Sequence, residues 1–212
     1  MGDEAGLLVP IGHDLGPLYE EIGVHRRVQQ VRVGADVVEL DDHDFVVWLL
    51  THGTSAEDRP TRSTVLAAAA QFGLDRGKAD AAITRFLADG LLVEIELGGP
   101  SALAFARRHQ LFPLMLGLGQ DTDEPSMRLV GLYEQPVAQV SSAVYDVWFW
   151  SHLAPNLWTA CHDAAETARR AGMTDQTELD PSQVLAGALG AVHGLLSCRA
   201  AYIDHARPRG EA

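Results

Sequence analysis

Three helix-forming stretches follow one another between residues 41 and 90, and this run constrains the fold more than any other feature. The first begins at a capping acid, the second lies within residues 61–71, and the third spans residues 76–89 with apolar side chains at spacings of three and four. Only a short segment, residues 72–75, separates the last two. A tight turn between two short helices predicts a helix-turn-helix unit.

β-Strand patterns stand on both sides of these helices. The β-branched runs Val31–Val33 and Asp36–Leu40 flank Gly34-Ala35, where the glycine supplies the positive φ of a type II′ hairpin turn. Leu7–Val9 is expected as a short edge strand. After the third helix, residues 91–97 read as a strand and residues 102–106 as its return strand. A hairpin, three helices and a second hairpin predict a winged helix.

Several strings resemble known winged-helix proteins. Residues 73–93 look like the turn and third helix of bacterial winged-helix regulators. Residues 37–45 resemble the strand-to-helix entry of both OmpR-type effector domains and PqqD-like recognition elements, and the closing Asp89–Leu92 is closer to the latter. The resemblance covers roughly residues 29–97 and implies either DNA binding or binding of a precursor peptide's leader for a partner enzyme. No family resemblance is recognised for residues 106–212.

The charge distribution bears on the choice between DNA and peptide. The chain has 16 Lys+Arg and 29 Asp+Glu; residues 1–100 hold 17 acids and 8 bases, net −9, and the remainder 12 acids and 8 bases, net −4, which together give −13. Affinity for nucleic acid rests on cations that neutralise phosphates, and Asp80 would lie against them. A DNA-binding regulator is therefore the alternative function, with its donors at Arg76, Lys78, Thr84 and Arg85.

A peptide partner is the favoured prediction. The strand Val37–Leu40 at a sheet edge can pair with an extended peptide through backbone hydrogen bonds, and the groove toward the third helix supplies side-chain pockets. We therefore expect a non-enzymatic recognition protein that binds a peptide or protein partner. The predicted peptide-binding residues are Val37, Glu39, Leu40, Lys78 and Arg85.

The second half is expected to be mostly helical and to serve dimerisation or partner binding. Helices are predicted over residues 139–152, residues 156–170 and from Asp180 to about Asp204, whereas residues 111–118 and 127–133 are strands or extended connectors. The fold class is thus α+β, mainly α: a winged-helix domain with an N-terminal β-hairpin in residues 1–106 and a helical bundle in residues 107–212. An aromatic cluster is core, a homodimer interface or an apolar ligand pocket: Tyr145, Trp148, Phe149, Trp150 and Trp158. Trp148 and Trp150 cannot lie on one helical face, so one of the two is expected to leave the core.

The sequence lacks the common motifs of enzymes and cofactor sites, including the P-loop, the dinucleotide fingerprint, the nucleophile elbow and His-Glu-x-x-His. The acids around His43 are expected to cap and solvate a helix, because neighbours on a helix point in different directions. The cysteines of the second half are expected to be buried and the histidines partly exposed, because their spacing gives no natural bidentate pair: Cys161, His162, His193 and Cys198. No metal or cofactor is predicted, and an enzyme is the third-ranked function.

A few simple features of the sequence predict where in the cell the protein resides. Two cysteines far apart give no disulfide framework, and no stretch approaches the roughly 18 apolar residues of a membrane span. The acidic start Met1–Glu4 differs from the basic start of a signal peptide. These features predict a soluble, cytoplasmic protein without membrane association.

Overall fold

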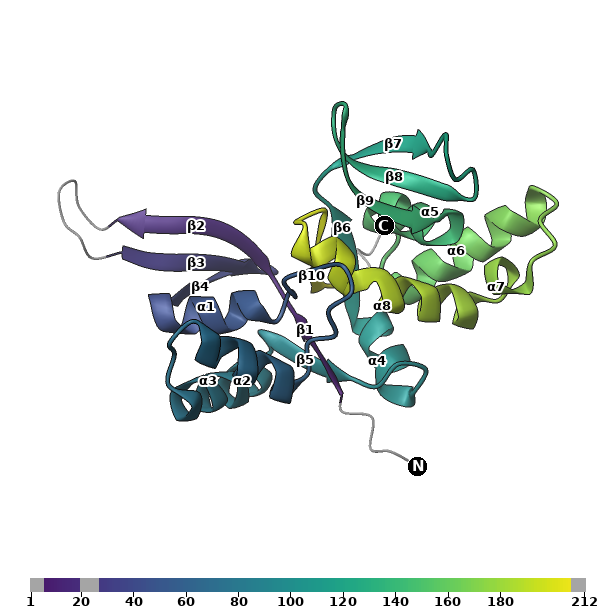
Figure 1. Cartoon of the computed structure of the whole chain (residues 1–212). Helices are drawn as coiled ribbons and strands as arrows, with labels where there is room; N and C mark the ends of the chain where they lie inside the picture. The colour runs from purple at the N-terminus through teal and green to yellow at the C-terminus, as the bar shows by residue number, and fades with distance from the viewer. Residues whose placement is uncertain (1–5, 20–26, 207–212) are drawn as a thin grey trace.

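The computed structural model describes residues 6–19 and 27–206 (Figure 1). Within them the chain forms eight α-helices, one short 3-10 helix and ten strands in four small sheets. With 46% of the described residues helical and 29% in strands, the protein is mixed rather than mainly α. The expected winged helix followed by a helical bundle is therefore wrong, for the local reasons given below.

The first sheet is antiparallel with the order β2-β3-β4: β2 (His13–Tyr19), β3 (Arg27–Val33) and β4 (Asp36–Leu40). The predicted hairpin of β3 and β4 is confirmed, and Gly34 adopts φ +60° at its first loop position. The register of β2 shifts between Asp14 and Gly16. Figure 1 shows this sheet extending to one side of the molecule, beyond the helices that follow it.

The three predicted helices are present: α1 (Asp42–Leu50), α2 (Arg62–Gln71) and α3 (Arg76–Asp89). Each begins at a side-chain cap, Asp41, Thr61 or Asp75, that accepts a hydrogen bond from a free backbone amide of the first turn. The apolar faces of the helices meet the inner face of the β3–β4 hairpin in one core that includes Val31, Leu40, Trp48, Ile83 and Phe86. These elements are decided by local sequence signals.

The predicted second hairpin does not form. β5 (Leu92–Ile95) pairs instead with the buried β1 (Leu7–Pro10), and the expected return strand is helix α4 (Pro100–Arg108). Proline at the start of a helix costs no hydrogen bond, and the spacing of Ala102, Phe105 and Ala106 buries one helical face. The helix-turn-helix segment thus lacks a wing.

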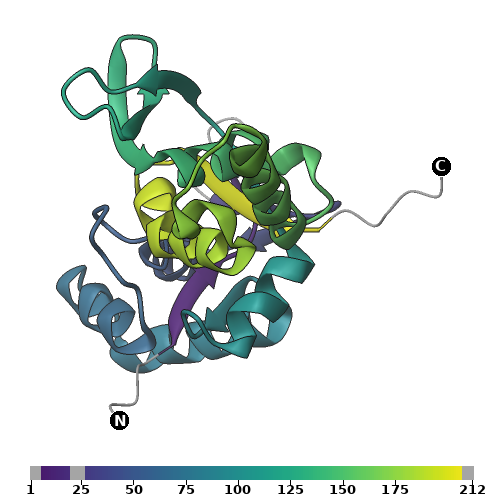
Figure 2. The ribbon, with the colours of Figure 1, turned by 90° about the vertical axis from the view of Figure 1, so that its right-hand side faces the viewer.

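The second half contains five strands. The segment predicted as a strand or connector at residues 127–133 is a strand, whereas residues 111–118 span parts of two strands and the last two strands were not predicted. β6 (His109–Pro113) pairs with the C-terminal β10 (Ala201–His205), and a separate antiparallel sheet has the order β7-β8-β9. The ranges of that sheet are β7 (Leu116–Gln120), β8 (Met127–Leu132) and β9 (Gln135–Ser141). Figure 2 shows this sheet projecting from the body of the protein.

The helices of this half are α5 (Ser142–Trp150), the 3-10 helix η1 (Ser151–Leu153), α6 (Leu157–Arg170), α7 (Gln176–Leu179) and α8 (Pro181–Ser197). The helix predicted from residue 139 begins only at Ser142, because β9 occupies the preceding residues. The helix predicted to reach Asp204 ends at Ser197, where Arg199 takes φ +57° and turns the chain into β10. The prediction for residues 156–170 is confirmed, with Asn156 as the cap.

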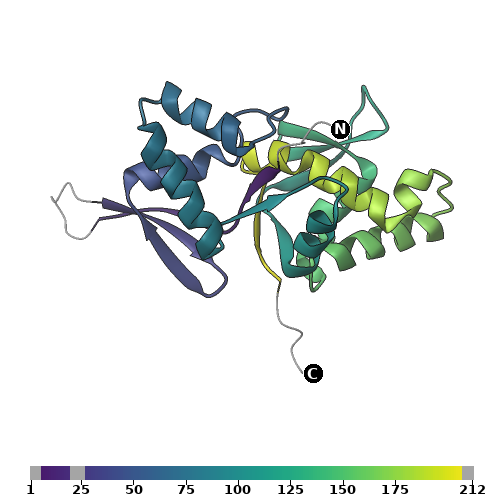
Figure 3. The ribbon, with the colours of Figure 1, turned by 90° about the horizontal axis from the view of Figure 1, so that it is seen from below.

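The two halves share their cores. Leu7, Val9 and Ile11 from the N-terminal strand belong to the same apolar cluster as α4, α5, α6 and α8. Gly12 also forms an isolated bridge with Ile203 of β10. Seen from below in Figure 3, α8 lies across the C-terminal half, and the helices α1–α3 lie beside it. The C-terminal half therefore holds the N-terminal sheet in place.

Candidate functional site

The strand β4 has an open edge. It pairs with β3 on one side, and within residues 6–19 and 27–206 no other strand pairs with it. The strand β1 does not cover this edge, because it pairs with β5. An unpaired strand presents a row of backbone donors and acceptors to solvent.

The register of the hairpin identifies which backbone groups are open. Val33 and Asp36 flank the two-residue turn and form a hydrogen-bonded pair, so the next pair, Arg32 with Val37, is a non-hydrogen-bonded one. By the same alternation, the backbones of Glu39 and the opposite Gln30 form a non-hydrogen-bonded pair. The N–H and C=O groups of Val37 and Glu39 therefore point away from β3, toward the open edge.

The side chains of β4 alternate between solvent and core. Val37 is 50% exposed, and Glu39 is exposed and accepts a 3.4 Å hydrogen bond from Gln30 Nε2. Val38 and Leu40 face the other way, and Leu40 is buried against the first core. Of the three predicted β4 site residues, Val37 and Glu39 are thus on the surface, whereas Leu40 supports the strand from within.

Helix α3 lies close to the end of this edge. Arg85 forms an ion pair with Asp44, which belongs to the first turn of α1 immediately after β4. Lys78 precedes Arg85 by two helical turns on the same side of α3, and its exposed ammonium group has no side-chain partner in the described part of the chain. The structure therefore links Arg85 to a residue that follows β4 by four positions, whereas Lys78 lies two helical turns away along α3.

Two of the four residues expected to read DNA, Thr84 and Arg85, are engaged within the protein. Arg62 of α2 donates to Asp80 Oδ1 at 2.7 Å and to Thr84 Oγ1 at 2.6 Å. The hydrogen bond from Arg62 lowers the pKa of Asp80, so this acid stays ionised on the face where phosphates would lie. Since Arg85 is paired with Asp44, the exposed cations left on this face are Arg76 and Lys78.

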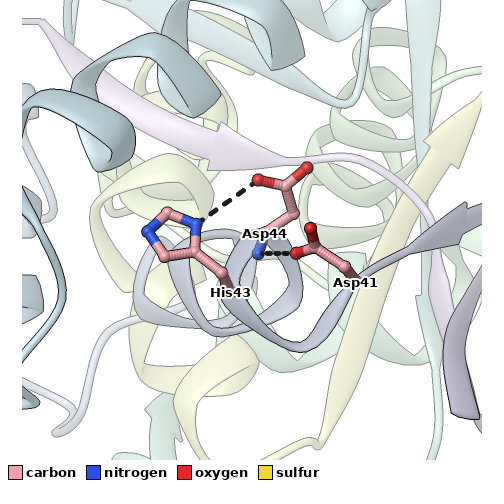
Figure 4. Close-up of side chains that lie close together, drawn as sticks. All are labelled: Asp41, His43 and Asp44. Carbon is pink, nitrogen blue, oxygen red and sulfur yellow. Dashed lines mark hydrogen bonds and ion pairs between the residues drawn. The ribbon is translucent and has the colours of Figure 1, made fainter. Parts of the chain in front are cut away.

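Three potential metal ligands gather at the start of α1 (Figure 4): one ligand atom each of Asp41, His43 and Asp44 lies within 4.8 Å of the others. The expectation that neighbouring side chains diverge fails here because Asp41 is the cap, outside the helix. Its Oδ1 accepts from the Asp44 amide at 2.8 Å, and His43 Nδ1 lies 3.5 Å from Asp44 Oδ1. Asp41 caps α1, as expected for one of these acids, and Asp44 pairs with the Arg85 guanidinium, a contact that the sequence did not predict.

The cysteines and histidines of the second half do not converge. Among the described residues, the group at α1 is the one where three or more such ligands meet. Burial raises the pKa of the Cys161 thiol to about 12, and the Cys198 thiol donates to Gly194 O. His193 was expected to be partly exposed, but it is 1% exposed and its Nε2 lies 2.9 Å from Leu8 O.

The aromatic residues divide between core and surface. Trp148 is fully buried, and its indole N–H donates to Ala200 O at 3.0 Å. Tyr145 and Trp158 are partly buried, whereas Trp150 is 57% exposed. The sequence argument that one of the two tryptophans leaves the core is confirmed. Of these four residues, Trp150 has the most open surface.

A further hollow, lined by apolar and titratable side chains, lies where the two halves meet and was not anticipated. It has a volume of about 300 Å³ and brings together His13, Asp14, His52, Arg199 and Tyr202. Asp14 and Arg199 form a 3.6 Å ion pair there. Burial lowers the pKa of His52 to about 4, which keeps this imidazole neutral near pH 7. No motif signals such a site, because its residues come from segments far apart in the chain.

Comparison of the chain with models of protein families, with curated proteins and with solved structures gives no match. In the described residues, no helix combines the length and the apolar character needed to cross a membrane. The function is therefore argued from the geometry of the residues themselves.

Proposed function

We propose that this protein is a recognition module that binds an extended peptide segment by adding it as a strand to β4. The observation that carries this proposal is the open edge on which Val37 and Glu39 direct their N–H and C=O groups outward. Strand addition gains affinity from main-chain hydrogen bonds, and specificity from side chains that alternate along the added strand.

The surface chemistry of β4 favours a particular kind of peptide. Val37 offers an exposed apolar side chain, and Asp36 and Glu39 on either side of it are exposed acids. Cross-strand neighbours of opposite charge stabilise a sheet, and apolar residues pair with β-branched ones. The preferred peptide therefore places an apolar residue beside Val37 and a cationic residue beside Glu39.

DNA binding has weaker support. Arg76 and Lys78 are exposed on α3, but Arg62 and Arg85 are held by Asp80 and Asp44. The whole chain carries a net charge of −13, which repels a polyanion at long range. The peptide proposal is therefore the stronger of the two.

The experiment uses a displayed library of random peptides selected on the full chain, followed by affinity measurements with the selected peptides. Val37→Pro removes an outward N–H, and Val37→Thr is the matched control that keeps the N–H and the β-branch. We expect selected peptides to lose binding to the proline variant and to retain binding to the threonine variant. Peptides that bind both variants equally would contradict the proposal, and salt-sensitive binding of duplex DNA would favour the alternative.

A further inference from the structure

A hollow of about 370 Å³ lies between α5, η1 and α6, far along the chain from β4. Its walls are Asp146 and Trp150 from α5, Leu153 and Ala154 around η1, and Ala160, Asp163, Ala164 and Thr167 from α6. The volume lies within the range of small-molecule sites, roughly 300–1,000 Å³. A ligand that fills this hollow has to match the shape and charge of these walls.

The hollow exists because of how two helical faces meet. Asp146 and Trp150 are four residues apart and share one face of α5. The opposing face of α6 presents small side chains, Ala160 and Ala164, so the helices leave space between them. A second hollow of about 180 Å³ shares Asp146, Ala164 and Thr167 with it, and its other walls include Arg128 and Glu178.

The carboxylate of Asp146 is incompletely satisfied in this position. The residue is partly buried, and the described residues provide it with neither a hydrogen bond nor an ion pair. The nearest cationic influence comes from Arg128, whose guanidinium donates instead to Pro125 O and Met127 O. Burial raises the pKa of Asp146, which reflects the cost of a carboxylate that has lost water without gaining a donor.

The remaining walls complement a cation that carries an apolar body. Asp163 adds a second carboxylate from the opposite helix, also without a side-chain partner in the described part of the chain. Trp150 and Leu153 are 57% and 70% exposed at the rim, and an indole face attracts a positive charge. Acids on two sides and an apolar rim distinguish this hollow from a site for an anion or a purely apolar ligand.

We infer that this groove binds a small organic ammonium ion whose apolar or aromatic part packs on Trp150 and Leu153. The ammonium group lies between Asp146 and Asp163 and donates hydrogen bonds to both carboxylates. This site does not depend on the β4 edge, so each can fail while the other holds.

Calorimetric titration of the full chain with 2-phenylethylamine tests the inference, and 2-phenylethanol and 3-phenylpropionate serve as neutral and anionic analogues. We expect the amine to bind, and the two analogues to bind at least about tenfold more weakly, because the ion pair with the partly buried Asp146 is lost. Equal affinity for the alcohol, or no binding of the amine to the folded wild-type chain, would overturn the inference.

Variants locate the site. Asp146→Asn keeps the shape of the side chain and should weaken amine binding about tenfold or more, whereas Asp89→Asn, an exposed acid on α3, should leave it unchanged. Ala164→Leu fills the groove and should also abolish binding, while circular dichroism checks that each variant is folded. Val37→Pro should bind the amine normally. Amine binding that survives both Asp146→Asn and Ala164→Leu would place the ligand elsewhere and refute the assignment.

Discussion

Arg32 on β3 and Asp204 on β10 form a 3.2 Å ion pair, although 172 residues separate them, and the Asp204 side chain is only 4% exposed. Asp204 also accepts a 2.7 Å hydrogen bond from the Gly34 amide in the hairpin turn. The C-terminal strand therefore holds the hairpin that carries the β4 edge. This link connects the candidate site to the rest of the protein.

Removing the negative charge of Asp204 should destabilise the whole chain. Asp204→Asn leaves Arg32 without its partner and weakens the bond to Gly34, so we expect the free energy of unfolding to fall by about 2–4 kcal/mol in urea denaturation. Asp89→Asn, an exposed acid without a partner in the described residues, should change it by less than about 0.5 kcal/mol. Similar small effects of both substitutions would show that the ion pair contributes little.

The alternation of inward and outward N–H groups along β4 can be tested by measuring the free energy of unfolding of proline variants. The Val38 N–H lies on the β3 side and takes part in the sheet, whereas the Val37 N–H is open. Val38→Pro should therefore cost about 3 kcal/mol or more, and Val37→Pro about 1 kcal/mol or less. If Val37→Pro were the more damaging substitution, the assignment of the open edge would be reversed.

The free energy of unfolding should fall in mild acid, because burial keeps histidine side chains neutral that bind protons in the unfolded chain. Burial lowers the pKa of His52 to about 4, against 6.5 in the unfolded chain, so the unfolded state binds more protons between these values. The contribution of His52 is present above pH 6.5 and is lost as pH falls toward 4. We expect the free energy of unfolding to drop by at most about 2 kcal/mol from this residue between pH 7.5 and 5.

The measurement is urea denaturation at both pH values, for the wild-type chain and for His52→Asn. The variant should show a smaller loss on acidification. The pKa values of His109 and His193 are lowered by burial as well, so part of the acid sensitivity should remain in the variant. Equal losses in both proteins would exclude His52 as a source.

The two cysteines should differ sharply in reactivity. Cys161 is fully buried with its pKa raised to about 12, whereas Cys198 is partly exposed. Because the thiolate is the reactive species, a disulfide reagent should modify Cys198 first in the native chain, and Cys161 only after unfolding. Cys198→Ser should abolish the early phase; an early phase that persists would indicate that Cys161 is accessible.

Substitutions of Trp148 and Trp150 compare the stability contributed by a core tryptophan with that of a surface tryptophan. Trp148→Phe deletes the hydrogen bond to Ala200 O and leaves a cavity in the core, so we expect a loss of about 2–4 kcal/mol. Trp150→Phe at the exposed rim should change stability by less than about 1 kcal/mol. The emission maximum should shift to the blue in the Trp150 variant, because an exposed indole is removed.

Helices and turns near the N-terminus were predictable because their signals are local. The capping acid before α1, the glycine of the hairpin turn and the apolar spacing of α3 all act within a few residues, and each appears in the structure as expected. The same locality made β4 recognisable as a strand. It also led to Val37, Glu39 and Leu40 as peptide-binding residues of that strand; Leu40 is buried, and binding by the other two stays a prediction.

Tertiary structure decided everything that depends on a distant partner. Residues 102–106 become helical while β5 takes β1 as its partner, and Arg199 turns the chain so that β10 reaches β6 and Asp204 reaches Arg32. A strand is stable only with a neighbour to satisfy its backbone, and a carboxylate is buried only with a donor. The sequence by itself therefore determined the helix-turn-helix segment and its hairpin, and only the folded chain determined which edge stays open and which charges remain unpaired.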